Sequence, residues 1–174
     1  MIETERLILQ PLTYEQLVKY ARCDNSLEEE LNLNETSRTI SAELKEALEQ
    51  TILPNVADPT KNYLYSTLWT AILKAERKMV GDLCIVGEPN ASGEIEIGYG
   101  TYDAFQGRGF MTEIVGGMIE WAKTQAGIKS MIASTDKTNA ASFKVLQKNH
   151  FSKIGETEAL LHWKLELRDE AIAG

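Results

Sequence analysis

Hydrophobic and polar positions along the chain follow two periods. Apolar residues at every second position predict strands, and apolar residues three or four apart predict helices. Strands are predicted in the ranges 6–10, 63–73, 79–86, 94–99 and 131–133, with two more within 151–167. Helices are predicted after Thr13, twice within 26–48, from the loop at 106–109 to about 125, and over 139–148. This order predicts an α+β fold with a βαβ step in its second half.

Prolines and glycines indicate where these elements end or come close to one another. Pro54 and Pro59 are predicted to close the second helical segment, because proline lacks the amide hydrogen that a helix interior needs. Gly116 and Gly117 stand inside a predicted helix, where two glycines cost about 2 kcal/mol relative to two alanines. We therefore expect close packing of that helix on the sheet.

Composition and charge narrow the class of protein. The chain fits one domain over residues 1–174, with residues 168–174 as a flexible tail. It contains no run of the roughly 20 apolar residues that a membrane span needs, and residues 1–5 do not resemble a secretory signal. We expect a cytoplasmic protein with no membrane partner. A formal net charge of -8 disfavours nucleic acid, and Cys23 and Cys84 show no metal-ligand spacing, so no metal is expected.

A glycine-rich run at 106–112, Gln-Gly-Arg-Gly-Phe-Met-Thr, lies between a predicted strand and a predicted helix. Such a turn leaves backbone N–H groups unpaired at the positive end of the helix dipole, which suits a pyrophosphate. The alternative is a tight turn with nothing bound. A dinucleotide fingerprint would need a third glycine at Thr112, and a P-loop would need Gly-Lys-Ser/Thr, so both are excluded.

The run resembles the Q/R-x-x-G-x-G/A acyl-CoA signature of the GNAT superfamily, with Gln106 and Gly109 in place. Further segments that are similar to its RimJ/RimL-type branch are 4–7, 96–99, 109–113, 139–142 and 146–151. Two positions depart from the pattern. Met111 replaces the usual Gly or Ala, and His150 replaces a glycine at a helix end, where we expect Asn149 to adopt the left-handed conformation instead.

The resemblance implies the GNAT fold, a mixed central β-sheet flanked by helices, and acetyl-CoA as co-substrate. The implied cofactor-binding residues are Ile97, Tyr99, Gln106, Gly107, Arg108, Gly109, Phe110, Met111, Thr112, Asn139 and Ser142. In the family the strand before the loop and the next strand splay apart. The free edge at 97–101 is then expected to bind pantetheine, with an N–H near Ile97 or Gly98 as oxyanion donor.

The resemblance also implies catalytic roles. Ser142 is the implied donor to the departing thiolate, since Leu146 occupies the position where other branches carry a tyrosine. Glu96 is the predicted base, because alternation along its strand separates Glu96 from Ile95 and Ile97. A water chain as the base, and a merely solvated Glu96, are the alternatives. Asn139 is also explained as a helix N-cap.

The predicted function is transfer of the acetyl group of acetyl-CoA to a primary amine, either a protein N-terminus or a small amine, by direct attack on the thioester. The alternative is a non-catalytic acyl-CoA-binding regulatory domain of the same fold, suggested by the departures at Met111 and His150. The sequence leaves open both the acceptor and the choice between a monomer and a homodimer.

Overall fold

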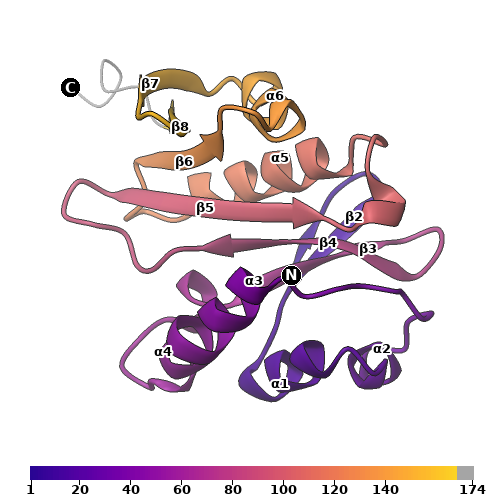
Figure 1. Ribbon diagram of the computed structural model, residues 1–174. Coiled ribbons are helices and arrows are strands. Elements are labelled where there is room, and N and C mark those ends of the chain that lie inside the picture. Colours follow the sequence, from indigo (N-terminus) through magenta and orange to yellow (C-terminus); the bar gives the residue numbers. More distant parts are fainter. Residues whose placement is uncertain (168–174) are drawn as a thin grey trace.

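The structure, a computed structural model, describes residues 1–167; the predicted tail at 168–174 lies outside the described residues. Within that range the strands form one sheet of eight in the order β1-β2-β3-β4-β5-β6-β8-β7 (Figure 1). The strands are β1 (Ile2–Glu3), β2 (Leu7–Pro11), β3 (Leu68–Leu73), β4 (Lys78–Ile85), β5 (Glu94–Thr101), β6 (Ser130–Asp136), β7 (Ser152–Glu156) and β8 (Leu160–Glu166).

Helices cover both faces of this sheet, so the predicted α+β class with a mixed sheet is confirmed. They are α1 (Tyr14–Arg22), α2 (Ser26–Glu30), α3 (Ala42–Ala47), α4 (Leu53–Ala57), α5 (Phe110–Lys123) and α6 (Ala140–Lys148), with short turns η1 (Leu48–Ile52), η2 (Tyr63–Tyr65) and η3 (Asp103–Phe105). Among residues 1–167, β5 and β6 form the only parallel pair of neighbouring strands. No helix in this range is long and apolar enough to cross a membrane.

Two hydrophobic clusters hold the two layers of helices against the sheet. Figure 1 shows α5 on one side of the sheet and α1 to α4 on the other. Trp69 and Ala71 of β3 belong to the cluster under α5, whereas Leu68 and Ile72 belong to the cluster under the N-terminal helices. Because side chains alternate along a strand, β3 contributes to both clusters and all six of its residues are buried.

Two boundary predictions were wrong. Pro54 does not close the helical segment: α3, η1 and α4 follow one another without a break, and Pro54 comes directly after η1, a wider π-helical turn in which the N–H of Leu53 donates to the carbonyl of Leu48. The strand predicted from residue 63 begins only at Leu68, and Tyr63 to Tyr65 form the turn η2. The side chain of Asn62 caps that turn by accepting from the N–H of Leu64.

The expected close packing of the glycine pair on the sheet is confirmed for Gly117. A Cβ at Gly117 would lie 2.7 Å from Cγ2 of Thr4 and 3.3 Å from Cδ1 of Leu9, so the N-terminal segment packs directly on the backbone of α5. A Cβ at Gly116 would meet Oδ1 of Asn149 at 3.4 Å, an ordinary contact. The two neighbouring glycines therefore have different reasons to be there.

We expect Gly117→Ala to lower the free energy of unfolding by about 1–3 kcal/mol, because the added methyl group overpacks the contact with Thr4. Gly116→Ala is the matched control, and its gain in helix propensity is at most about 1 kcal/mol. Urea denaturation of both variants measures the difference. A Gly117→Ala variant as stable as Gly116→Ala would contradict the packing argument.

Candidate active site

The site begins where β5 and β6 separate. Their parallel pairing covers only Glu94–Glu96 against Ser130–Ile132, and β5 then continues to Thr101 without β6 beside it. Even-numbered residues of β5 direct their backbone groups to β4, since the carbonyl of Glu96 accepts from Val86 N–H and the N–H of Tyr102 donates to Val80. The N–H of Ile97 completes the last parallel bridge, to Ile132, so the carbonyl of Ile97 and the backbone groups of residues 99 and 101 face the splayed edge.

A cavity of about 490 Å³ lies at this edge, between the glycine-rich loop and α6. We call it the loop cavity. Most of the predicted cofactor-binding residues line it: Tyr99, Gln106, Gly107, Gly109, Phe110, Met111, Thr112, Asn139 and Ser142. Residues 43 positions apart in sequence, such as Tyr99 and Ser142, thus meet at one site.

Three predicted site residues do not line the loop cavity. Ile97 is buried in the core cluster, and only its backbone faces the edge. Arg108 stacks its guanidinium over the ring of Phe110 at 4.8 Å. The side chain of Glu96 lines neither the loop cavity nor the second cavity described below. The roles assigned to Ile97, Arg108 and Glu96 stay predictions.

The conformation of the loop suits an anion. Gly107 and Gly109 both have φ of +77°, a conformation that side chains rarely adopt. Gly109 is the N-cap of α5 and offers no side chain to the N–H groups of the first turn. These N–H groups, at the start of a 14-residue helix, suit a phosphate.

Two lysines that the sequence reasoning missed also line the loop cavity, Lys144 and Lys148 of α6. They stand four residues apart and therefore on one face of the helix. That spacing, within a helix predicted from Asn139, is the signal that would have revealed them. Their positive charges lie on the opposite wall from the loop and add to its attraction for an anion.

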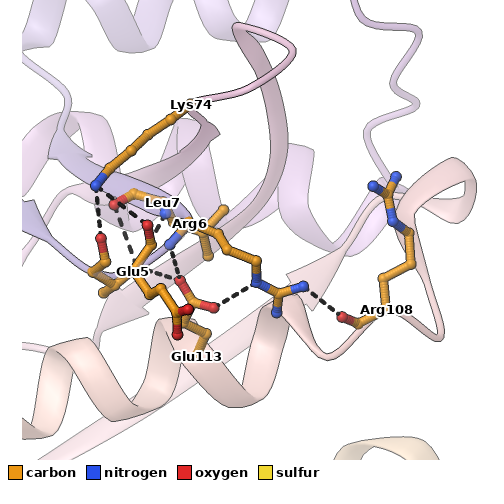
Figure 2. A network of polar contacts seen from close by, with 7 residues as sticks. Glu5, Arg6, Leu7, Lys74, Arg108 and Glu113 are labelled. Atoms are coloured by element: carbon orange, nitrogen blue, oxygen red, sulfur yellow. Dashed lines mark hydrogen bonds and ion pairs between the residues drawn. The ribbon is translucent and has the colours of Figure 1, made fainter.

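Arg6 connects the N-terminal segment to this loop (Figure 2). Its Nε donates to Oε1 of Glu113 at 2.7 Å, its backbone N–H donates to Oε2 at 2.8 Å, and its Nη1 donates to the carbonyl of Arg108 at 3.0 Å. The hydroxyl of Thr4 donates to the same carboxylate at 2.5 Å. We call this set of bonds the Arg6 clasp; it fixes the loop to the first turn of α5.

The carboxylate at the centre of the clasp is held ionised. Partial burial alone would raise the pKa of Glu113, but hydrogen bonds from Thr4 and Arg6 hold it below its ordinary value. A charged Glu113 in the first turn of α5 also interacts favourably with the helix dipole. The similarity of residues 4–7 to the RimJ/RimL branch was noticed in the sequence, but the contact with Glu113 was not.

The departure at Met111 is accommodated inside the core. Its side chain is buried, and Cε lies 3.5 Å from the place a Cβ on Gly81 would take. That distance is an ordinary contact, so the buried Met111 side chain packs against β4, whereas the close approach at Gly81 is to the carbonyl of Gly100, at 2.7 Å. Met111 still lines the loop cavity.

The expectation for the departure at His150 was wrong in one respect. His150 itself adopts the left-handed conformation, with φ of +69°, while Asn149 has φ of −94°. The N–H of His150 donates to Gln147 and that of Phe151 to Leu146, which is the pattern of a Schellman end. Asn149 is needed elsewhere: its amide donates to the carbonyls of Thr112 and Val145 and joins α6 to α5.

Ser142 and Tyr99 form the polar centre of the loop cavity. The hydroxyl of Ser142 donates to Tyr99 Oη at 3.3 Å, and the Tyr99 hydroxyl donates to the backbone carbonyl of Ser142 at 2.9 Å. Asn139 caps α6 by accepting from the N–H of Ser142 at 3.1 Å. Burial raises the pKa of Tyr99, so its hydroxyl stays protonated at neutral pH.

A second cavity of about 710 Å³ lies across β5, between the sheet and the segment that joins α2 to α3. We call it the helix-side cavity. Its wall includes Tyr20, Arg38 and Asp82, none of which the sequence reasoning selected. Residues Tyr99, Gly100 and Thr101 of β5 line both cavities. The splayed edge is therefore the place where the two cavities meet.

This fold and site define an acetyltransferase of the GNAT class. Residues 6–152 match the profile of the acetyltransferase (GNAT) domain family, and the chain belongs to that family. The resemblance noticed in the sequence is confirmed.

A curated relative and two solved structures illustrate the similarity. The chain is 25% identical over 166 residues to an uncharacterized N-acetyltransferase, YjdG of Bacillus subtilis, covering 94% of this chain and 96% of the relative. It shares the fold of the ribosomal-protein-S5-alanine acetyltransferase of Vibrio fischeri, with a TM-score of 0.70, 20% identity and 96% of each chain covered. It also shares the fold of the ribosomal L7/L12 alpha-N-protein acetyltransferase RimL in complex with coenzyme A, with a TM-score of 0.66, 16% identity and 94% and 95% covered.

Removing the Arg6 clasp tests its effect on the loop. We expect Arg6→Ala to weaken coenzyme A binding by about tenfold, because the loop carbonyl and the Glu113 carboxylate lose their charged donor. Calorimetric titration with coenzyme A measures the change. Arg22→Ala, in the exposed last turn of α1, removes an equal charge far from the loop and serves as control. Equal affinities in the two variants would show that the clasp does not organise the loop.

Proposed function

We propose that the protein transfers the acetyl group of acetyl-CoA to a primary amine, by direct attack of the amine on the thioester. The observation that carries this proposal is the meeting of the two cavities at Tyr99, Gly100 and Thr101. A thioester bound from the loop cavity would present its carbonyl carbon to an amine in the helix-side cavity. Proximity and orientation of the two reactants then supply much of the rate.

The splayed edge supplies the groups that such a reaction needs. Pantetheine is an extended arm with amide groups, and the free N–H and C=O groups of the odd-numbered residues of β5 are its natural partners. Of the two oxyanion donors predicted from the sequence, the N–H of Gly98 is directed to β4 and that of Ile97 completes the last parallel bridge, to Ile132. We therefore assign this role to the next N–H that faces the splayed edge, that of Tyr99. It would stabilise the negative charge that develops on the carbonyl oxygen.

The leaving thiolate requires a proton donor near Ser142. Ser142 Oγ and Tyr99 Oη lie 3.3 Å apart in the loop cavity, and either hydroxyl has a proton to donate. We assign the donation to Ser142, with Tyr99 replacing the proton. Leu146 occupies the position where other branches of the family carry a tyrosine. In this protein Tyr99 of β5 brings a phenol to the site instead.

The acceptor remains in two classes, a protein N-terminus or a small amine, and Glu96 remains the base predicted from sequence. A non-catalytic acyl-CoA-binding domain is the rival function. The joint presence of a second cavity at the thioester edge and of the Ser142–Tyr99 pair favours catalysis. Neither feature would be needed for binding acyl-CoA alone.

A bulky side chain in the loop tests the cofactor assignment. We expect Gly109→Trp to abolish acetyl-CoA binding, because Gly109 lines the cavity and has φ of +77°. Gly87→Trp is the matched control, since Gly87 also has positive φ, +86°, but lines neither cavity. Calorimetric titration with acetyl-CoA, with NAD and ATP as further ligands, decides. Undiminished acetyl-CoA affinity in Gly109→Trp would remove the loop from cofactor binding.

Replacing the Ser142 hydroxyl tests the chemistry separately from binding. We expect Ser142→Ala to lower turnover by about 10-fold to 100-fold while acetyl-CoA affinity is kept. Tyr99→Phe keeps the ring in the wall and is expected to lower turnover less. Thiol release with a panel of amines measures turnover, and calorimetry measures affinity. Full turnover in both variants would remove this pair from the reaction.

A further inference from the structure

Asp82 is a buried carboxylate in the wall of the helix-side cavity for which neither the fold nor the proposed function has yet supplied a role. It lies in the middle of β4, and only 7% of its surface is exposed. Oδ2 accepts a hydrogen bond from Tyr20 at 2.5 Å and another from Tyr102 at 3.0 Å. Among the described residues, no group with hydrogen-bond geometry donates to Oδ1, and the Thr70 hydroxyl, opposite Asp82 on β3, is the neighbour whose side chain lowers the pKa of Asp82 without meeting that geometry.

Burying this carboxylate has a large electrostatic cost. Desolvation raises the pKa of Asp82 to about 6, against the lowering effect of Tyr20, Tyr102 and Arg38. At neutral pH the group is therefore ionised but a much stronger base than an exposed aspartate. Such a value lies close to the pH at which a general base works best.

Asp82 has charged and titratable neighbours on several elements, in addition to the Glu43 and Asp103 carboxylates that line the same cavity. Tyr20 comes from α1, and burial raises its pKa so far that it stays a neutral donor. Burial likewise raises the pKa of Tyr102, which lies just after β5. Arg38 forms an ion pair with Glu28 of α2 at 2.6 Å, and burial raises the pKa of Cys84 on β4 to about 11.

The sheet leaves room beside this carboxylate. Asp82 pairs with Gly100 and Cys84 pairs with Gly98, so the glycines lie opposite these side chains on the same face of the sheet. A Cβ built on Gly100 would meet no atom within 4 Å, and one on Gly98 would meet only the sulfur of Cys84. The space above the two glycines is open to the helix-side cavity, which both of them line.

The charge of the cavity wall selects a cation. Glu43, Asp82 and Asp103 contribute carboxylates to the lining, whereas the one basic residue in it, Arg38, is already paired with Glu28. A cation that enters would supply positive charge to an ionised, incompletely bonded Asp82. A neutral or anionic ligand would leave that buried charge uncompensated.

We propose that the helix-side cavity binds the acceptor as a protonated primary amine and that the carboxylate of Asp82 receives its proton. This inference rests on the proposed function, and it replaces Glu96 as the base. The two glycines provide the path by which the amine reaches the splayed edge of β5.

The proton and bond changes balance. The ammonium gives one proton to Asp82, and the freed lone pair attacks the thioester carbon, forming the C–N bond. The tetrahedral intermediate collapses with cleavage of the C–S bond. The nitrogen loses a second proton, which replaces the proton that Ser142 and Tyr99 deliver to sulfur. The products are the amide and coenzyme A with its sulfur as the neutral thiol, and Asp82 releases its proton to solvent.

The test is the pH dependence of kcat/KM in the intact protein, from about pH 5 to about pH 9. The reaction is measured by thiol release from acetyl-CoA, with a panel of peptide N-termini and small amines as acceptors. For the wild type we expect kcat/KM to fall as the pH drops through about 6, because protonated Asp82 accepts no proton. Asp82→Asn is expected to remove this acidic limb and to lower kcat/KM about 100-fold. Its acetyl-CoA affinity should be unchanged.

Two further variants separate chemistry from structure. Tyr20→Phe removes a donor to Asp82 from a residue that is 1% exposed, so the acidic limb should move to higher pH. Gly98→Leu places a side chain in the helix-side cavity, at a glycine that lines that cavity and not the loop cavity, and should abolish acetylation with acetyl-CoA binding retained. If Asp82→Asn does not fold, the direction of the Tyr20→Phe shift decides.

The outcomes are distinct. A wild type that acetylates no amine overturns the proposed function, and this inference with it. If the wild type is active but Asp82→Asn keeps the acidic limb, the inference alone is overturned. Removal of that limb by Glu96→Gln would then identify Glu96 as the base. The inference is also overturned if the acidic limb of kcat/KM lies at the same pH in Tyr20→Phe as in the wild type.

Discussion

The separation of β5 from β6 is the constraint on which the rest of the site depends. Parallel pairing stops at Glu96, and the unpaired stretch of β5 that follows leaves backbone donors and acceptors without a strand to satisfy them. Buried backbone groups need partners, so an edge of this kind in the interior of a sheet is costly unless a ligand binds it. The loop cavity lies at this edge, and its walls come from the loop, α5 and α6.

The loop beside this edge depends on contacts that are distant in sequence. Its left-handed glycines make the turn possible, but the Arg6 clasp determines where the turn lies relative to α5. Thr4 makes two contacts with α5: its methyl group packs against Gly117, and its hydroxyl donates to Glu113. Packing and charge thus fix the same segment, and the loop is supported by the connection between β1 and β2 together with α5.

Local sequence signals account for the parts of the structure that were predicted. The glycine run at 106–109 and the N-cap at Asn139 are signals within a few residues, and both lie where they were expected. Pro54 was misread because the π-helical turn at Leu48–Ile52 carries the helix past the proline, and no local pattern predicts such a turn. The conformation of His150 was missed because Asn149 makes hydrogen bonds to α5 that no local pattern reveals.

The buried polar groups could not be predicted for a different reason. Asp82 is one acidic residue in an apolar strand, and its partner Tyr20 is 62 residues away in sequence. Arg6 and Glu113 are 107 residues apart. Nothing in the spacing of such residues indicates a contact, because their proximity is produced by the pairing of β2 with β3 and by the packing of α5. Glu96, which does stand in a recognisable pattern, was selected for that reason.

Alternation along β5 explains how one strand serves both cavities. Its odd-numbered residues direct their backbone to the splayed edge, and Tyr99 among them extends its side chain toward Ser142. Its even-numbered residues 98 and 100 are glycines, so the opposite face is bare beside Asp82. A larger residue at either glycine would still allow the edge to form but would fill the approach to it. The period of two that identifies β5 as a strand therefore also separates the side that binds the loop's ligand from the side that admits the amine.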